Sequence, residues 1–494
     1  MTASTAVEAV AAPRSLRSLV GVLSAMAVSL TGTRVSAIAL PWFVLATTGS
    51  ATMTGVVAFV EMTPYVLVKA FTGPVIDRLG PRVVSWTTDT VSAVAAALVP
   101  LLHGLGLLPF WLLLVLVATV GAVRGPGDLA KEVMVPEAAD HARVPLERAT
   151  GLSGVTERLA STIGPAVGGG LVALLGPMAG LTLNAVAFGL GALVVLVVLP
   201  RGMGRGAIAP TITKSARAAD SADSVESAQS ARAAESAQPT RADEPAGYWQ
   251  MFREGFTFLR GEPLLLTVIV MIAVTNLLDA GFMTVLVPLW AQQSGGGPAA
   301  IGLTGSAWGI AAVTGSLIAA AVAHRLPRRV VFFAGFLLCG APRFLVLALD
   351  APIGVVLAVF AVGGFGSGFL NPILGAVTFE RVPRHLLGRV GALGDSLAWA
   401  GIPLGGLLAG AAVALSGLIP VLLVGGGLYF ATTSLAALRP EWREMDRLRG
   451  RGPAADPHEP ERSAPPVPSP TGAAESGAGA DRHLLSVAGA KADG

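Results

Sequence analysis

The residues best suited to chemistry are ionisable side chains that stand alone within long apolar stretches. Glu61 lies in VVAFVEMTPYVL, Asp279 lies in NLLDAGFM, and Arg34 lies in the first apolar stretch. A charge at bilayer depth costs about 2.5–3.5 kcal/mol on insertion scales, so such residues usually bind an ion or a substrate or pair with one another. We predict that Arg34 pairs with Glu61, and that Glu61 and Asp279 bind a proton or a substrate. A structural ion pair is the alternative for both carboxylates.

Further polar side chains on these stretches could serve the same site. Asn276 lies one turn before Asp279, Asp89 lies about two turns into the stretch 83–103, and Asp395 lies about two turns into the stretch 388–415. Arg343 is a further isolated charge in the stretch 330–349. For Asp89 and Asp395 the structural interpretation, an ion pair or a hydrogen bond between helices, is favoured over a direct role in binding.

The composition is that of a polytopic membrane protein. Hydrophobic residues make up 53% of the 494 residues and charged residues only 13%, whereas soluble proteins carry about 25% charged residues. The net charge is +3, and the basic residues gather in loops on one side, which argues against a nucleic-acid partner. Cys339 is the single cysteine, so no intramolecular disulfide can form, and no Cys/His cluster indicates a metal site.

Twelve stretches are long and apolar enough to cross a bilayer, which takes about 20 residues. They are about 16–46, 52–76, 83–103, 107–127, 150–175, 177–199, 263–291, 299–323, 330–349, 352–379, 388–415 and 417–438. Alternate connections hold no Lys or Arg, and the others hold all the basic loop residues, among which we count Lys131 with Arg143 and Arg148. The positive-inside rule then places both termini in the cytoplasm. We expect the chain to be a multi-pass protein of the plasma membrane.

The chain divides into two membrane halves joined by a polar segment. We predict a first six-helix bundle at 14–200, a disordered Ser/Ala/Arg/Glu-rich linker at 201–247, a second bundle at 248–440 and a disordered tail at 441–494. Residues 248–261, YWQMFREGFTFLRG, alternate aromatic and charged side chains as an amphipathic interfacial helix does.

One basic hinge occurs twice. Residues 73–84 read GPVIDRLGPRVV, and residues 320–331, which lie 247 positions later, read AAVAHRLPRRVV. A doubled bundle is the usual architecture of a secondary transporter. At the same offset Trp308 takes the place of Glu61, which suggests that the second half contributes an aromatic surface to the site where the first contributes a charge.

The first copy of the hinge resembles the loop signature of the major facilitator superfamily. The resemblance covers about 14–440 and implies that the loop latches the two halves together in the outward-facing state, with Asp395 as a partner on the eleventh span. The loop residues that carry it are Gly73, Asp77, Arg78, Gly80 and Arg82. The second copy departs from the signature, with His324 at the Asp position and Pro327 at the second Gly.

Two further motifs resemble those of the same family. The fifth stretch holds Gly164, Pro165, Gly168 and Gly169, which match the antiporter motif G-x-x-x-G-P-x-x-G-G except that Ala160 replaces its first Gly. Ordinary packing of small residues is the alternative. Arg124, in VRGPGDLA, resembles the arginine of a span-four motif without the glutamine that follows it there, and we group it with the latch. A side chain that reaches the membrane interface is the alternative for Arg124.

These observations predict an all-α membrane protein of twelve helices in two six-helix bundles, with a substrate cavity between them. The resemblance implies a monomeric, proton-coupled exporter of small hydrophobic or amphiphilic compounds, close to the macrolide- and siderophore-exporter branch, without enzymatic activity or a cofactor. Export of an endogenous metabolite, import of a nutrient and a non-transporting sensor built on this scaffold are the alternatives.

Overall fold

The computed structural model describes residues 15–201, 203, 248–322, 325–383 and 386–446. Within them, twelve helical spans are long and apolar enough to cross a membrane, which confirms the predicted fold class. Most of the predicted linker and tail lie outside these residues. The tail boundary predicted at 441 falls inside the 3-10 helix η5 (Pro440–Asp446), whose Trp442 and Met445 are buried.

The first half consists of six long helices and one short one. The spans are α1 (Arg17–Thr48), α2 (Ala51–Phe71), α4 (Pro81–Gly104), α5 (Phe110–Ala142), α6 (Leu146–Leu175) and α7 (Pro177–Val198). The hinge forms the short helix α3 (Gly73–Leu79). Gly80 follows it with a φ of 86°, a conformation that glycine adopts without strain. The proline at the first position of α4 then begins the next helix.

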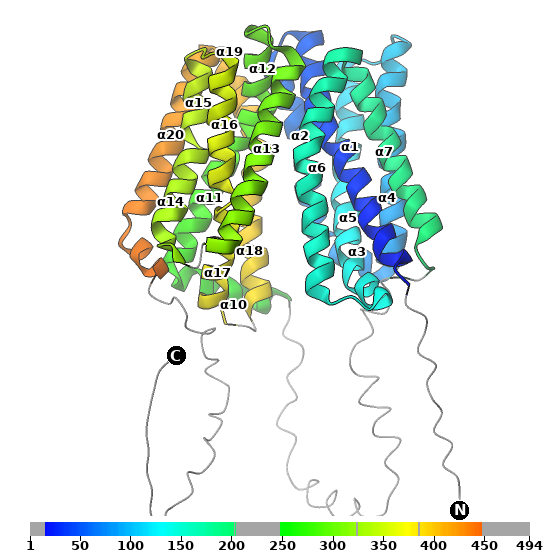
Figure 1. The fold of residues 1–494 in the computed structure, drawn as a ribbon. Coiled ribbons are helices and arrows are strands. Elements are labelled where there is room, and N and C mark those ends of the chain that lie inside the picture. Colours follow the sequence, from blue (N-terminus) through cyan, green and yellow to red (C-terminus); the bar gives the residue numbers. More distant parts are fainter. Residues whose placement is uncertain (1–14, 202, 204–247, 323–324, 384–385, 447–494) are drawn as a thin grey trace, which may run out of the picture. The chain divides into compact units, whose positions relative to one another are not determined.

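The second half has the same number of spans, but four of them are interrupted. Its elements are α10 (Tyr248–Gly261), α11 (Pro263–Gly281), the π-helix η2 (Phe282–Leu286), α12 (Val287–Gln293), α13 (Gly297–Val322), α14 (Arg328–Cys339), α15 (Ala341–Ala348), α16 (Ile353–Ser367), α17 (Leu370–Arg381), α18 (Leu387–Trp399), α19 (Ile402–Ser416) and α20 (Leu418–Leu438). The breaks at Gly340 and Gly401 each precede a proline by two residues, and proline removes a backbone donor and bends the helix. In Figure 1 this half runs from green to orange beside the blue and cyan first half.

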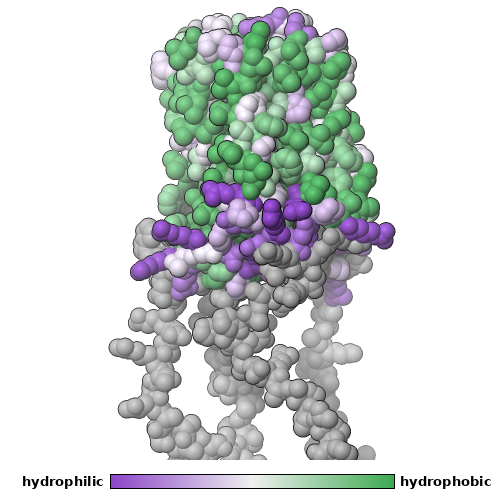
Figure 2. Space-filling model, turned by 90° about the vertical axis from the view of Figure 1, so that its left-hand side faces the viewer, coloured by the Kyte–Doolittle hydropathy of each residue, from purple (hydrophilic) through white to green (hydrophobic). Residues whose placement is uncertain are grey.

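The surface of the second half carries a hydrophobic band and a hydrophilic belt. Figure 2 shows the band over most of the helices' length and the belt close to one end. We call this the basic end. The connections that hold Arg78, Arg143 and Arg439 lie at it, and the connections at 49–50, 105–109 and 176 lie at the opposite end. A band of this kind fits the hydrocarbon layer of a bilayer.

The fourth span is longer than the sequence indicated. The apolar stretch ends at about 127, whereas α5 continues to Ala142, and Lys131 is a buried helical residue instead of a loop residue. The prediction was wrong because hydropathy averages over all sides of a helix. The final turns of α5 direct charged side chains into the bundle, so their mean hydropathy falls although the helix continues.

The two halves pack together away from the basic end. Gly169 on α6 lies against Gly302 on α13, and Thr52 on α2 donates a hydrogen bond of 3.3 Å to the carbonyl oxygen of Gly410 on α19. Towards the basic end α6 is free of the other half, since the consecutive residues 157–159 are all exposed although they point to different sides of the helix. The space between the halves is therefore closed at the opposite end and open at the basic end.

We expect Gly169→Ala to weaken this closure. Its new Cβ would lie 2.5 Å from the Cα of Gly302 and 2.8 Å from the carbonyl oxygen of Pro298, and overpacking of this kind costs about 1–3 kcal/mol. Leu174 on α6 and Leu303 on α13 are exposed and can be replaced by Cys to carry spin labels. In Gly169→Ala the distance between the two labels should be long in a larger fraction of molecules. Gly170→Ala is the matched control, because no atom lies within 4 Å of its added Cβ. Equal distance distributions in the two variants would contradict the role of Gly169.

Candidate functional site

Two cavities lie side by side between the halves, and Trp399 lines both. The first, of about 300 Å³, is lined mainly by the first half, and we call it the charged cavity. Its ionisable lining residues are Arg34, Lys69, Arg124, Asp128, Lys131, Glu132 and Glu157. The second, of about 420 Å³, is lined only by residues of the second half, and we call it the aromatic cavity. Its aromatic and acidic lining residues are Trp308, Phe332, Phe336, Trp399, Tyr429, Asp279 and Asp395.

Glu61 pairs with Arg124 and not with Arg34. An Arg124 guanidinium nitrogen lies 3.0 Å from a Glu61 carboxylate oxygen, and the guanidinium stacks over the Tyr65 ring at 4.4 Å from its centroid. The predicted Arg34–Glu61 pair was wrong because α2 packs along α5 and presents Glu61 to it. Arg124 therefore lines the charged cavity, and its place in the latch stays a prediction.

Arg34 faces the charged cavity from α1. Its electrostatic partner is Glu157 on α6, but among the described residues no carboxylate oxygen lies within 4.0 Å of its guanidinium group. The Cβ of Arg34 packs directly on Gly164, so a larger residue at 164 would displace it. Arg34 thus presents a positive charge to the cavity without a close counter-ion of its own.

Asp279 pairs with Arg343, a partner that the sequence did not indicate. The Asp279 side chain is 34% exposed, whereas Arg343 is buried behind it and is bonded to its carboxylate. The guanidinium carbon lies 4.8 Å from the centroid of the Phe282 ring and 4.9 Å from that of Trp308. Cation–π contacts of this kind partly replace the hydration that a buried guanidinium loses. The apolar context of Arg343 was the only available signal, and it gave no partner.

The other predicted residues of the second half surround this pair. Asn276 donates a hydrogen bond of 3.0 Å to the carbonyl oxygen of Ala398, which ties α11 to α18. Trp308 lines the aromatic cavity and also contacts Arg343. Asp395 lines the same cavity and is exposed, with Lys69 as its electrostatic partner across the two halves.

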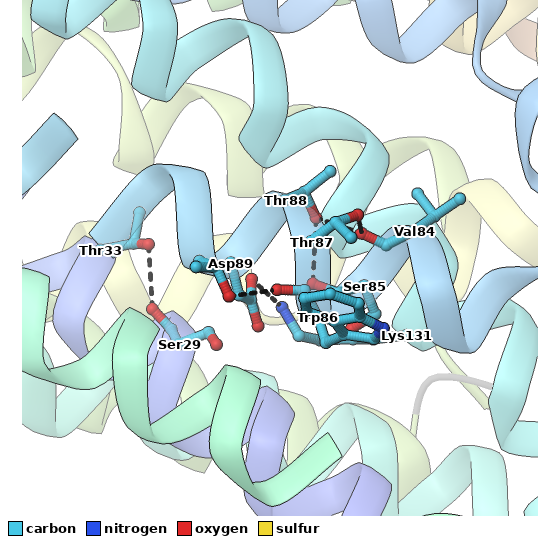
Figure 3. Close-up of polar contacts among 10 residues, drawn as sticks. Ser29, Thr33, Val84, Ser85, Trp86, Thr87, Thr88, Asp89 and Lys131 are labelled. Carbon is cyan, nitrogen blue, oxygen red and sulfur yellow. Dashed lines mark hydrogen bonds and ion pairs between the residues drawn. The ribbon is translucent and has the colours of Figure 1, made fainter. Parts of the chain in front are cut away.

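Asp89 pairs with Lys131 inside the first half. The Lys131 ammonium nitrogen lies 2.8 Å from a carboxylate oxygen of Asp89, and the two side chains are 2% and 3% exposed. Figure 3 shows the two groups pointing toward one another from α4 and α5, with Ser29 on the neighbouring α1. Lys131 also lines the charged cavity. The sequence singled out Asp89 but assigned its partner to a loop.

The latch residues lie at the basic end of the first half. Arg82 donates hydrogen bonds of 2.7 Å and 3.2 Å to the carbonyl oxygens of Leu196 and Leu199, at the end of α7. Arg78 is exposed, and Gly73 and Gly80 bound α3. The structure does not describe the side chain of Asp77. Among the loop side chains that it does describe, none has a hydrogen bond or ion pair to the second half.

The second half has its own ion pairs at the basic end, which the sequence did not predict. Arg328 binds both carboxylate oxygens of Glu380 at 2.6 Å and 2.9 Å, and Arg381 binds Glu262 at 3.0 Å and Glu444 at 3.2 Å. These pairs join α14, α17, α11 and η5 within one half. They therefore stabilise that half without restraining it against the other.

The antiporter motif lies where α6 crosses two helices. Gly164 and Gly168 pack on Arg34 and Val35 of α1, Gly169 packs on Gly302, and Pro165 packs on Gly305 of α13. The motif thus lets α6 contact both α1, which carries Arg34, and α13, which forms the closed end of the interface. Among the described residues, no three His, Cys, Asp or Glu side chains converge as metal ligands do.

Comparisons with known proteins agree on one family and one fold. The model of the Major Facilitator Superfamily matches residues 22–295 and 268–467. The Multidrug efflux pump Tap of Mycobacterium tuberculosis is 31% identical over 432 residues, which cover 86% of this chain and 94% of the relative. The Multidrug efflux pump Tap of Mycolicibacterium fortuitum is 28% identical over 427 residues, which cover 84% of this chain and 94% of the relative.

Two solved transporters share the fold at low sequence identity. The nucleoside transporter NupG has a TM-score of 0.63 at 14% identity, and the match covers 85% of this chain and 98% of that structure. A POT family transporter in complex with a thioalcohol-conjugated peptide has a TM-score of 0.59 at 14% identity, covering 85% and 94%.

The unequal burial of Asp279 and Arg343 predicts unequal effects of substitution. Asp279→Asn leaves the buried guanidinium without a counter-ion and should destabilise the protein by about 3–5 kcal/mol. Arg343→Met should cost less, because the remaining carboxylate reaches the cavity, and Asp279→Asn/Arg343→Met should recover most of the loss. Thermal unfolding in detergent measures all three. Equal losses for the two single variants would contradict this account of the pair.

Proposed function

This chain belongs to the major facilitator superfamily, and from that premise we propose that it exports small amphiphilic compounds from the cytoplasm in exchange for protons. The observation that carries the proposal is the meeting of the charged and aromatic cavities at Trp399. A transporter that exchanges unlike solutes requires a group that binds the ion and a surface that binds the substrate, both reached from the same opening.

The aromatic cavity supports an amphiphilic and preferably cationic substrate. Rings such as Trp308 and Tyr429 bind varied shapes through stacking and dispersion. Two carboxylates, Asp279 and Asp395, are the only charged side chains among the described residues that line it. A compound with a positive charge and an apolar body would satisfy both features. The relatives named multidrug efflux pump support export of such compounds.

The orientation follows from charge. Basic connections remain in the cytoplasm by the positive-inside rule, so we place the basic end and both termini there, in the plasma membrane. The opening at the basic end then faces the cytoplasm, as an exporter ready to load its substrate requires. We propose a monomer as the working unit, because the internal repeat supplies both halves of the transporter within one chain.

Glu61 is the proton-binding group in this proposal. A proton that binds its carboxylate neutralises it, which weakens the attraction that holds Arg124 at 3.0 Å and frees the guanidinium for other partners. Arg34 and Asp128 line the charged cavity together with Arg124 and are available to respond, whereas Glu61 lines a separate small cavity of about 30 Å³. On the outer side, the protein binds a proton and releases the substrate. On the cytoplasmic side, it releases the proton and takes up the next substrate.

The closed end and the hinge loop supply the two alternating seals. The glycines of the antiporter motif close the end opposite the basic one in the state described above. In the outward-facing state we propose that Asp77, Arg78 and the rest of the loop latch against the span that carries Asp395. The exposure of Asp395 in the present state supports a partner that docks only in the other state.

We expect Glu61→Gln to abolish uptake of ethidium, a fluorescent amphiphilic cation, into proteoliposomes driven by an imposed pH gradient. Glutamine preserves the size of the side chain but removes the site of protonation, so the variant should insert into membranes at the wild-type level. Asp140→Asn is the matched control, an exposed carboxylate on the same side of the protein. Wild-type ethidium uptake by Glu61→Gln would refute the proton role of this residue.

A further inference from the structure

A series of alternating charges runs along one face of α5. Arg124, Asp128 and Lys131 are four and three residues apart, a spacing that aligns side chains on one side of a helix. Arg124 is paired with Glu61 and Lys131 with Asp89, and Asp128 interacts electrostatically with both Arg124 and Asp89. The series therefore begins and ends on a carboxylate, and the proposed function uses only one of the two.

The carboxylate at the far end is incompletely bonded although it is buried. One oxygen of Asp89 accepts the Lys131 hydrogen bond of 2.8 Å. The other, Oδ2, lies beside the Ser29 hydroxyl but makes no hydrogen bond of normal geometry among the described residues. The buried hydroxyls of Ser85 and Ser92 on α4 also have no hydrogen-bond partner among these residues. Buried polar atoms of this kind usually bind water, so the site has the capacity for a proton and for water to deliver it.

The charged cavity provides a route to this carboxylate. Ser29 and Lys131 line the cavity, and Figure 3 shows Asp89 close to both, with its hydrogen bond from Lys131. Glycines hold the surroundings close, since a Cβ on Gly191 would lie 2.6 Å from the Ser29 hydroxyl and 3.0 Å from Asp89 Oδ2. These contacts place the Ser29 hydroxyl, which lines the cavity, beside Asp89 Oδ2.

The fold does not require an ion pair at these positions. The internal repeat places Phe336 and Thr378 in the second half 247 positions after Asp89 and Lys131, and both are neutral residues that line the aromatic cavity. The same scaffold thus packs without the pair. A buried ion pair is in general no more stabilising than well-packed apolar residues, so packing alone does not account for this one.

We propose that Asp89 is a second proton-carrying group of the transporter, an inference that rests on the proposed exchange of protons for substrate. A proton from water in the charged cavity binds Asp89 Oδ2 and forms an O–H bond, while Lys131 keeps its own proton. The pair then changes from neutral to singly positive. Breaking the same O–H bond returns the proton to water at the basic end, so each cycle moves one proton through Glu61 and one through Asp89.

The charges that face Asp89 from each neighbouring element set its pH response. They are Lys131 and Asp128 on α5, whereas Ser29 on α1 and Gly191 on α7 are neutral. Arg34 on α1, Glu132 on α5 and Glu157 on α6 line the charged cavity that Lys131 also lines. Lys131 opposes protonation of Asp89, and the nearby carboxylates favour it. Binding of a cationic substrate beside these groups would favour release of the proton, as exchange requires.

The number of protons moved for each ethidium tests the inference. In proteoliposomes, Asp89→Asn/Lys131→Met should reduce this ratio to about half the wild-type value, because one of two carboxyl groups is lost. The double substitution removes both charges together, so it avoids leaving a buried Lys131 unpaired, as Asp89→Asn alone would. A merely structural pair would change the transport rate but not the ratio. An unchanged ratio would overturn the proposal for Asp89 while leaving that for Glu61 intact.

Infrared difference spectroscopy on the full chain gives an answer that needs no substrate. Between alkaline and acidic pH, the wild type should gain a carbonyl band of a protonated carboxyl group that Asp89→Asn/Lys131→Met lacks and that Asp140→Asn retains. Identical bands in the wild type and the double variant would overturn the inference. If wild-type vesicles move no protons with ethidium, the proposed function fails, and the spectrum still decides whether Asp89 binds a proton.

Discussion

The structure depends on one constraint, which is that a charge inside the bilayer needs a partner of opposite sign or a ring to lie against. Each half satisfies it differently. The first half distributes its charges over several helices, with Glu61 and Asp89 paired across neighbouring helices to Arg124 and Lys131 on α5. The second half instead buries one charge, Arg343, among aromatic rings and pairs it with a single carboxylate, that of Asp279. The contrast between a charged and an aromatic cavity follows from these two solutions.

The internal repeat relates the two cavities residue by residue. At the offset of 247, Ser29, Glu61 and Arg124 correspond to Asn276, Trp308 and Asn371, and all three of these second-half residues line the aromatic cavity. Ser29 and Arg124 line the charged cavity, whereas Glu61 lines a separate small cavity of about 30 Å³. The repeat therefore relates two of these three pairs across the two large cavities, and in the proposed function a proton and a substrate bind in different halves without competing for the same atoms.

The sequence was sufficient for the fold and the family, both of which are confirmed. Twelve apolar stretches and a repeat at fixed spacing are properties of the chain itself, and no packing detail can alter them. The identity of Glu61 and Asp279 as interior carboxylates was also evident, since a charge in an apolar run needs no structure to be noticed. Their partners were not evident. Glu61 turns to Arg124 instead of Arg34 because α2 packs along α5, and the pairing of Lys131 with Asp89 depends on how far α5 extends beyond its apolar part.

Two contacts at the closed end of the interface involve main chain, because Gly169 meets Gly302 and the Thr52 hydroxyl donates to the carbonyl oxygen of Gly410. The rings and charges that line the two cavities are other residues. In the proposed function, different residues therefore bind the compound and close the opposite end. On that proposal a single substitution, such as one at Trp308, changes the range of compounds that a cell tolerates while the movement that expels them is unaffected, so drug resistance can broaden in small steps without loss of the pump.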